Sequence, residues 1–144
     1  KESGETDLPI PLEKRIKSVK VGDDLAKTFG IKIIYFDLDK WNIRPDAAVD
    51  LAKIVDVLKE YPTMKVDVRS HTDSRQTKKY NEKLSDRRAK STIEWMVKDG
   101  IQSNRISGKG YGETQLLNRC SDGVECSEEE HQLNRRSEFI ITEL

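Results

Sequence analysis

The segment MKVDVRSHTD at residues 64–73 decides the fold of this chain. Apolar side chains alternate with charged ones over residues 64–69, which is the pattern of a strand with one buried face. The strand runs into a polar loop at His71-Thr72-Asp73, and a helical segment follows from about residue 78 to residue 98. Asp99-Gly100 ends that helix, because glycine readily adopts the left-handed conformation found at helix ends. The sequence therefore predicts a strand, a polar loop and a long helix in direct succession.

Further strands and one more helix flank this unit. Residues 31–37, IKIIYFD, are β-branched and aromatic and predict a buried strand. Pro45 stands where a first helical residue should, and apolar residues at helical spacing continue to Leu58, so an amphipathic helix is expected there. On the other side, residues 105–111 and 137–142 predict two more strands.

The resulting order of elements, β-α-β-α-β-β, indicates an α+β fold. Strands that alternate with helices favour a two-layer α/β sandwich, in which helices pack on one face of a mixed sheet. We expect this domain to cover residues 30–144. Residues 1–29 are interpreted as a linker and lead-in segment, since Pro9 and Pro11 interrupt any helix there.

The composition is that of a small domain with a well-solvated surface. Its 144 residues are enough for one two-layer core, and 36% of them are charged against 35% hydrophobic. The 26 basic and 26 acidic residues give a formal net charge of zero, which argues against nucleic acid as a partner. No apolar run is long enough to span a membrane, and no signal peptide is visible. We therefore expect a domain of a longer protein, with membrane attachment only through parts outside this sequence.

Cys120 and Cys126 bracket the short turn-forming segment SDGVE. Two cysteines so close together, with none elsewhere, favour a local disulfide that closes a small loop. Two free thiols or a metal-binding pair are the alternatives. A zinc site needs two further ligands, and His131 is the only candidate nearby, so we expect no metal. A disulfide implies an oxidising compartment, either the periplasm or the cell exterior.

Asp73 and Arg88 are the candidate binding pair. Asp73 stands in the loop after the strand, and loops at this place are common ligand sites. Arg88 follows fifteen residues later, and at about 100° per residue it shares a polar seam of the helix with Asn81 and Ser85. Such a pair can grip a zwitterion, with the carboxylate on its ammonium and the guanidinium on its carboxylate, and both side chains are expected at the surface. In the alternative interpretation, Asn81 braces the loop and Arg88 makes a structural ion pair.

Five motifs in order give residues 31–144 a resemblance to the OmpA-like peptidoglycan-binding domain. They are Tyr35-Phe36-Asp37 through Asn42-Ile43-Arg44-Pro45, His71-Thr72-Asp73, Tyr80-Asn81 with Leu84-Ser85 and Arg88-Ala89, Gly110-Tyr111-Gly112-Glu113, and Asn134-Arg135-Arg136-Ser137-Glu138. Any one of them alone is weak, but five at the spacing of the family make a specific signal. The cysteine loop resembles a branch found at the C-terminus of large outer-membrane lipoproteins, some of which serve protein secretion.

The resemblance implies a binding site for the meso-diaminopimelate of the peptidoglycan stem peptide. Asp73 and Arg88 would hold its free end, and the implied ligand-binding residues together are Asp73, Arg88, Thr72, Asn81, Asp39, Asn42, Arg135 and Arg136. One of the last two is expected near the pocket, and the sequence leaves open which. The family often has glycine where Ser70 and Gln76 stand here, so the loop after Asp73 is expected to take a different path.

The implied function is that of a periplasmic, non-catalytic anchor that attaches an outer-membrane protein to the cell wall and needs no cofactor. The alternative is a protein-interaction module of an outer-membrane secretion or assembly complex whose wall pocket has decayed. An enzyme is the other rival, with His71 and Asp73 as an acid/base pair or, with His131, as a metal site. We favour a His71 that only hydrogen-bonds within its loop, because residues two apart at a strand end need not converge.

Overall fold

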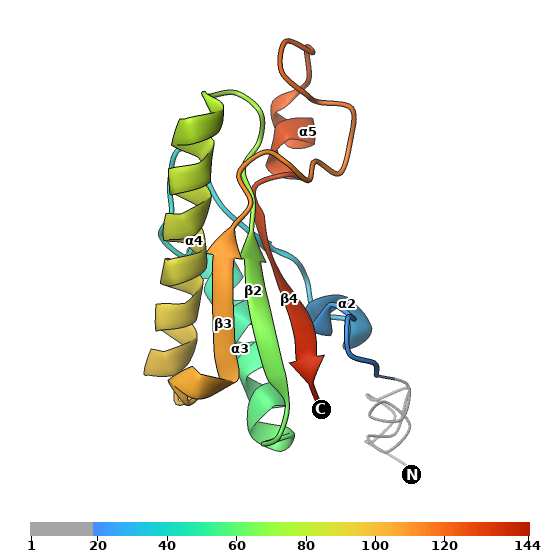
Figure 1. Ribbon diagram of the computed structural model, residues 1–144, viewed down its shortest axis with the longest axis vertical. Coiled ribbons are helices and arrows are strands. Elements are labelled where there is room, and N and C mark those ends of the chain that lie inside the picture. Colours follow the sequence, from blue (N-terminus) through green and yellow to red (C-terminus); the bar gives the residue numbers. More distant parts are fainter. Residues whose placement is uncertain (1–18) are drawn as a thin grey trace.

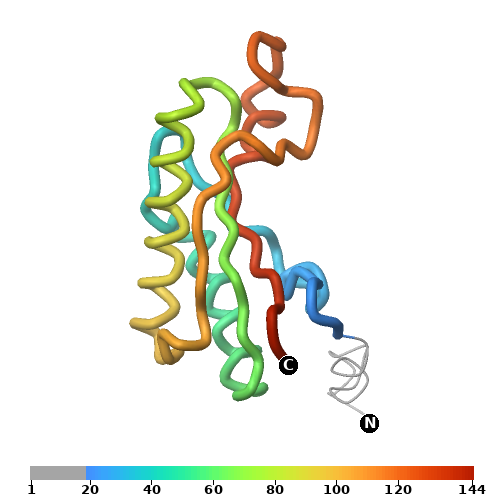
Figure 2. The backbone as a smooth tube through the Cα atoms, in the orientation of Figure 1, coloured from blue at the N-terminus to red at the C-terminus, as the bar shows by residue number. Residues whose placement is uncertain are grey.

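The computed structural model describes residues 19–144, so Pro9, Pro11 and most of the predicted linker lie outside the described residues. It contains a sheet with helices packed against it (Figure 1; Figure 2). In chain order the described elements are α2 (Leu25–Thr28), β1 (Ile34–Tyr35), α3 (Pro45–Glu60), β2 (Lys65–Ser70), α4 (Lys78–Lys98), the 3-10 turn η2 (Ser103–Arg105), β3 (Ile106–Gly110), α5 (Glu128–Gln132) and β4 (Arg136–Glu143).

The strands pair in the order β1-β4-β2-β3. Strands β2 and β3 run parallel, and α4 supplies the crossover connection that a parallel pair requires. Strand β4 lies between β1 and β2 and runs antiparallel to both. In Figure 1 its arrow points opposite to those of β2 and β3. The mixed sheet with α3 and α4 on one face confirms the predicted two-layer α+β fold.

The core lies between this face of the sheet and the two long helices. Val66 and Val68 alternate with charged residues on β2 as the sequence predicts, and both are buried. They pack with buried residues of β4, α3 and α4, among them Phe139, Ile141, Leu51, Ile54, Leu58, Ala89 and Met96. Burying one such aliphatic side chain stabilises the fold by about 1.5–3 kcal/mol. The packing of these side chains therefore determines which face of β2 is buried.

The first strand is much shorter than expected. The sequence predicts a strand over residues 31–37, but only Ile34 and Tyr35 pair with β4. Further along, the edge of β4 is occupied by the lead-in segment instead, because Asp24 bridges Ile140 and the Asp24 carboxylate accepts a hydrogen bond from the Phe139 amide. A strand cannot pair where another segment already holds the edge.

The lead-in segment is therefore part of the packed structure from residue 19 onward. Leu25 and Ala26 of the short helix α2, which the sequence analysis did not predict, are buried in the core. The Asp24 side chain caps α2 by accepting a hydrogen bond from the Ala26 amide. The domain boundary at residue 30 stays a prediction, although residues 19–29 contact the same core.

The long polar segment 112–134 folds over the carboxyl ends of β2 and β3, at the end of the molecule where α5 lies (Figure 1). It contains the Cys120–Cys126 disulfide, which confirms the favoured pairing over free thiols and a metal pair. The acidic run begins α5, where Ser127 and Glu130 form a reciprocal capping box. This segment brings α5 and the start of β4 next to the loop that carries Asp73.

Candidate functional site

Asp73 lies just beyond the carboxyl end of β2 and is 3% exposed, so the expected surface position is wrong. Its Oδ1 accepts a hydrogen bond from the Arg75 amide at 3.0 Å. Its Oδ2 accepts from Arg75 Nη2 at 2.8 Å and from Arg135 Nη1 at 3.0 Å. Burial by itself would raise the pKa of Asp73, but the hydrogen bonds from the two arginines outweigh it and the pKa is lowered. The carboxylate is therefore charged at neutral pH.

Arg88 is fully buried, which also contradicts the expected surface position. Its guanidinium donates to three backbone carbonyls, those of Lys40 at 2.7 Å, His71 at 3.0 Å and Asp37 at 3.0 Å. Burial lowers the pKa of Arg88 to about 10, and the like charge of Arg135 adds to the effect. Arg88 remains protonated at neutral pH, and it joins two loops through their carbonyls rather than forming the structural ion pair of the alternative interpretation.

A narrow pocket joins these groups, and it has no room for a water molecule as the side chains stand. It is lined by Leu38, Asp39, Thr72, Asp73, Gln76, Asn81, Leu84, Arg88 and Arg135. Six of the eight predicted ligand-binding residues therefore meet at one place, namely Asp39, Thr72, Asp73, Asn81, Arg88 and Arg135. Two predicted residues, Asn42 and Arg136, are absent from this lining.

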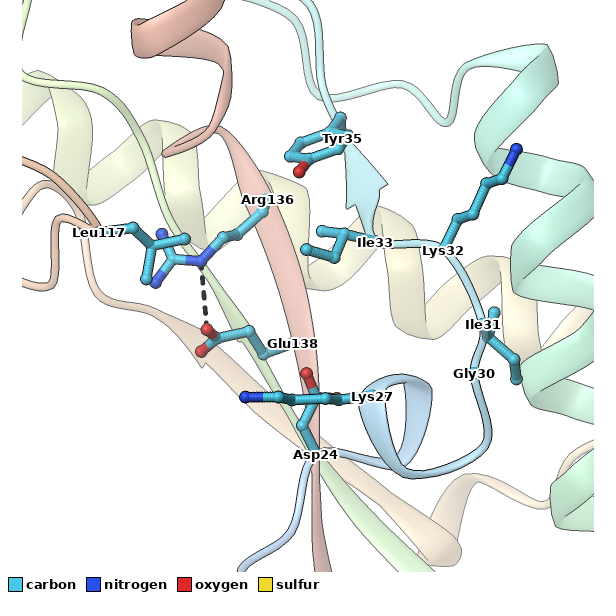
Figure 3. Close-up of a pocket in the computed structure, with 10 residues that line it drawn as sticks. All are labelled: Asp24, Lys27, Gly30, Ile31, Lys32, Ile33, Tyr35, Leu117, Arg136 and Glu138. Atoms are coloured by element: carbon cyan, nitrogen blue, oxygen red, sulfur yellow. Dashed lines mark hydrogen bonds and ion pairs between the residues drawn. The ribbon is translucent and has the colours of Figure 1, made fainter.

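The two neighbouring arginines before β4 diverge. Arg135 turns toward the pocket, donates to the Phe36 carbonyl at 2.8 Å and contacts Asp73. Arg136 turns to the other side of the sheet, where its Nε lies 3.1 Å from Glu138 Oε2. Figure 3 shows Arg136 and Glu138 in a separate groove that Tyr35 also lines. Arg135 is thus the arginine near the pocket, which the sequence left open.

The loop after β1 forms one wall of the pocket through Leu38 and Asp39. Asp39 adopts a φ of 58°, a left-handed conformation that aspartate tolerates better than most residues, and its Oδ1 accepts a hydrogen bond from the Tyr80 hydroxyl at 3.3 Å. Asn42 lies further along the same loop, is exposed and does not line the pocket, so its role stays a prediction. Thr72 contributes a buried Oγ1 that has no hydrogen-bond partner among residues 19–144.

The first half of α4 is held against the loops that surround the pocket. Asn81 Nδ2 donates to the Asp73 carbonyl at 3.1 Å and to Glu113 Oε1 at 3.0 Å, so Asn81 braces the loop as the alternative interpretation proposed. Ser85 Oγ accepts from the Gly112 amide at 2.8 Å. A Cβ at Gly110 would overlap Ser85, which explains a glycine at this point of the motif.

Sequence reasoning missed two charged residues that contact Asp73 or its partners. Arg75 Nη1 lies 2.9 Å from Glu128 Oε1, and Arg135 Nη2 lies 2.8 Å from Glu128 Oε2. Hydrogen bonds from these arginines lower the pKa of Glu128. Arg75 could have been suspected, because a side chain two residues beyond an aspartate in a loop can reach back to it. Glu128 gives no such signal, since it stands 55 residues from Asp73 in an ordinary acidic run.

The two histidines do not join the pocket lining. His71 Nε2 lies 3.0 Å from Glu138 Oε1 on β4, so its partner is across the sheet and not within the loop as expected. Burial lowers the pKa of His71, which keeps the ring neutral at neutral pH. Within residues 19–144, the one group spaced for a metal ion is Cys120, Cys126 and Glu130, and its two sulfurs are joined in the disulfide. In the same range, no helix has the length and apolar character needed to cross a bilayer.

Residues 35–130 match the model of the OmpA family. The chain belongs to the OmpA family. It is 36% identical over 108 residues to outer membrane porin F of Pseudomonas fluorescens, which covers 75% of this chain and 32% of the porin. It is 32% identical over 108 residues to the peptidoglycan-associated lipoprotein of Rhizobium meliloti, covering 75% of this chain and 58% of the lipoprotein. A 110-residue match at 38% identity to a Gloeobacter violaceus protein named photosystem I P700 chlorophyll a apoprotein A2 covers 75% of this chain and only 12% of that protein.

Solved structures share the fold. The peptidoglycan-associated lipoprotein of Burkholderia pseudomallei superposes with a TM-score of 0.70 at 20% identity, over 78% of this chain and 92% of that chain. The OmpA-like domain of FopA1 from Francisella tularensis gives a TM-score of 0.62 at 26% identity, over 77% of this chain and 73% of that chain. The cell wall anchor of the T6SS from Pseudomonas aeruginosa gives 0.61 at 24% identity, over 76% and 75%. The chain spans about a third to three fifths of the length of the porin and lipoprotein relatives.

Proposed function

We propose that this domain binds peptidoglycan without covalent attachment by capturing the diaminopimelate of a stem peptide. The observation that carries the proposal is that Asp73 and Arg88, which lie fifteen residues apart, line the same pocket. The side-chain ammonium of diaminopimelate would pair with Asp73. Its carboxylate would accept from Arg88, which uses three of its five N–H groups on carbonyls and keeps two. The names of the matched lipoproteins and of the cell wall anchor support a wall ligand.

In this proposal the domain is a periplasmic anchor and not an enzyme. The Cys120–Cys126 disulfide supports an oxidising compartment. The described pocket offers paired charges and hydrogen-bond donors, which suit reversible ionic capture. Attachment to the outer membrane would come from other parts of the parent protein. Parts of an outer-membrane or secretion complex are further candidate partners.

Calorimetric titration with two stem peptides tests the proposal. One peptide carries diaminopimelate, and the other carries lysine, which lacks the terminal carboxylate that Arg88 would bind. We expect binding of the first and weaker binding of the second. Asp73→Asn should weaken binding by about tenfold or more, because one charge-assisted hydrogen bond is lost. Asp56→Asn, an exposed change on α3, should leave it unchanged.

A second function is favoured by one observation, namely that both oxygens of Asp73 are already engaged by arginines of the chain. A domain whose wall pocket has decayed into an internal ion-pair cluster would serve protein interaction in a secretion or assembly complex. Absence of binding to either peptide, both by the folded wild-type protein and by a folded variant without the Arg75 charge, would favour this function and reject diaminopimelate capture.

A further inference from the structure

The Asp73 carboxylate is already paired with cationic side chains of the chain through Oδ2. Arg75 places Nη2 2.8 Å and Nε 3.3 Å from Asp73 Oδ2. The second cation, Arg135 Nη1, lies 3.0 Å from the same oxygen. A ligand ammonium can pair with Oδ2 only if one of these two guanidinium groups moves away, while Oδ1 keeps its hydrogen bond from the Arg75 amide.

The two arginines differ in how firmly they are held. The Arg135 side chain is 4% exposed, and its Nε donates to the buried Phe36 carbonyl, so its position is fixed by the fold. The Arg75 side chain is 31% exposed, and its other partner is Glu128, which is 57% exposed. An ion pair with solvent access contributes little net free energy, because water and salt screen it. Arg75 is therefore the cation that a ligand can displace.

Glu128 gives the displaced arginine a partner. It contacts Arg75 through Oε1 at 2.9 Å and Arg135 through Oε2 at 2.8 Å. When Arg75 leaves Asp73, its guanidinium can stay on Glu128. The exchange then replaces one cation on Asp73 by another, and no charge in the site is left without a partner.

We propose that Arg75 is a displaceable cap on the diaminopimelate site, and that the ligand binds by exchanging its ammonium for the Arg75 guanidinium on Asp73. This inference rests on the proposed function. The proposal agrees with the narrowness of the pocket, which must open to admit a ligand. Arg75 thereby sets the affinity of the site, because ligand binds only the uncapped fraction of molecules.

Removing the charge of Arg75 should strengthen binding. If the cap is closed in about nine molecules of ten, Arg75→Gln should lower the Kd for the diaminopimelate peptide about tenfold. The Arg75 amide that donates to Asp73 Oδ1 is retained in this variant. Arg75→Lys, which keeps the charge but loses the planar fork, should give a smaller gain.

Arg69→Gln is the matched control. Arg69 pairs with Asp67 two residues earlier, at 3.0 Å between Nε and Oδ2, in the same sequence arrangement as Arg75 and Asp73. Arg69 lies outside the pocket lining, so the Kd of the Arg69→Gln variant for the diaminopimelate peptide should equal that of the wild type. In an Asp73→Asn background the gain from Arg75→Gln should vanish, because the cap acts only through Asp73.

Calorimetry on these variants, each checked for a cooperative thermal transition, decides the proposal. Tighter binding by Arg75→Gln supports the cap, and so does binding by Arg75→Gln where the wild type shows none. Wild-type binding with equal or weaker binding by both Arg75→Gln and Arg75→Lys would overturn the cap and leave the proposed function intact. Absence of binding in the wild type and in both variants would overturn the two together.

Discussion

Arg88 serves the fold as much as the site. Its guanidinium donates hydrogen bonds to the Asp37, Lys40 and His71 carbonyls, which lie in the loops after β1 and β2. The bond to the His71 carbonyl is buried and the other two are part-buried. A buried carbonyl left unpaired costs about 1–3 kcal/mol, and the other two cost less because water can reach them. We therefore expect Arg88→Ala to lower the free energy of unfolding by about 3 kcal/mol or more, measured by urea denaturation.

The neighbouring Arg87→Ala is the control for this prediction. Arg87 is exposed, and its guanidinium lies over the Trp41 ring at 4.7 Å. An exposed cation–π contact contributes about 0.5–1 kcal/mol, so this variant should lose no more than that. Equal and small losses in both variants would show that Arg88 does not hold the loops. The expected result also means that lost binding in Arg88→Ala cannot by itself identify a ligand contact, which is why Asp73 and Arg75 carry the binding tests.

At the residue scale, the sequence predicts which residues meet but not how deeply they are buried. Asp73 and Arg88 come together because a strand, a loop and a helix in succession place them on adjacent parts of one unit, and this is local information. Their burial depends on Arg135, which contacts Asp73 but stands 62 residues further along the sequence. The cap by Arg75 and Glu128 has the same origin, since Glu128 reaches the site only through the fold of segment 112–134.

At the element scale, the disulfide loop stabilises the end of the molecule that carries the site. Cys120 is buried, and its carbonyl accepts a hydrogen bond from Ser74 Oγ in the loop after β2. A loop closed between positions six apart contributes about 2 kcal/mol by the chain-entropy model. We expect the paired change Cys120→Ala with Cys126→Ala to lower the free energy of unfolding by about that amount in urea denaturation.

Adding a reductant distinguishes the contribution of the disulfide bond from that of the two cysteine side chains. Added to the wild-type protein, it should shift the urea midpoint toward that of the paired variant. The variant has no cysteine left and should not respond. A wild-type midpoint that reductant leaves in place, with mass analysis showing two thiols formed, would mean that the loop is held by its hydrogen bonds alone.

Elements with strong local patterns were predicted well. Strand β2 and helices α3 and α4 lie where alternation, Pro45 and Asp99-Gly100 put them. Strand β1 was predicted too long. A β-branched composition indicates that a segment favours the extended conformation, but it does not indicate whether a sheet edge is free to pair with that segment. Residues 22–24 compete for that edge, and nothing in their own sequence shows it.

At the scale of the whole molecule, the lead-in segment and the binding pocket lie at different ends of the sheet. Residues 19–29 pack beside the carboxyl-terminal half of β4, where α2 lies in Figure 1. The pocket lies beyond the carboxyl end of β2. Stability and binding can therefore respond separately to a change in the lead-in segment. This separation makes the predicted domain boundary at residue 30 testable.

A chain that begins at Gly30 should be less stable than one that begins at Val19. It lacks the buried side chain of Leu25, worth about 1.5–3 kcal/mol, and it loses the hydrogen bond between the Phe139 amide and Asp24, worth about 1 kcal/mol. We expect a loss of about 2.5–4 kcal/mol in urea denaturation, with an unchanged Kd for the diaminopimelate peptide under conditions where both chains are folded. Equal urea midpoints would show that the domain proper begins at residue 30, and a Kd that weakens together with stability would show that the two ends of the sheet are coupled.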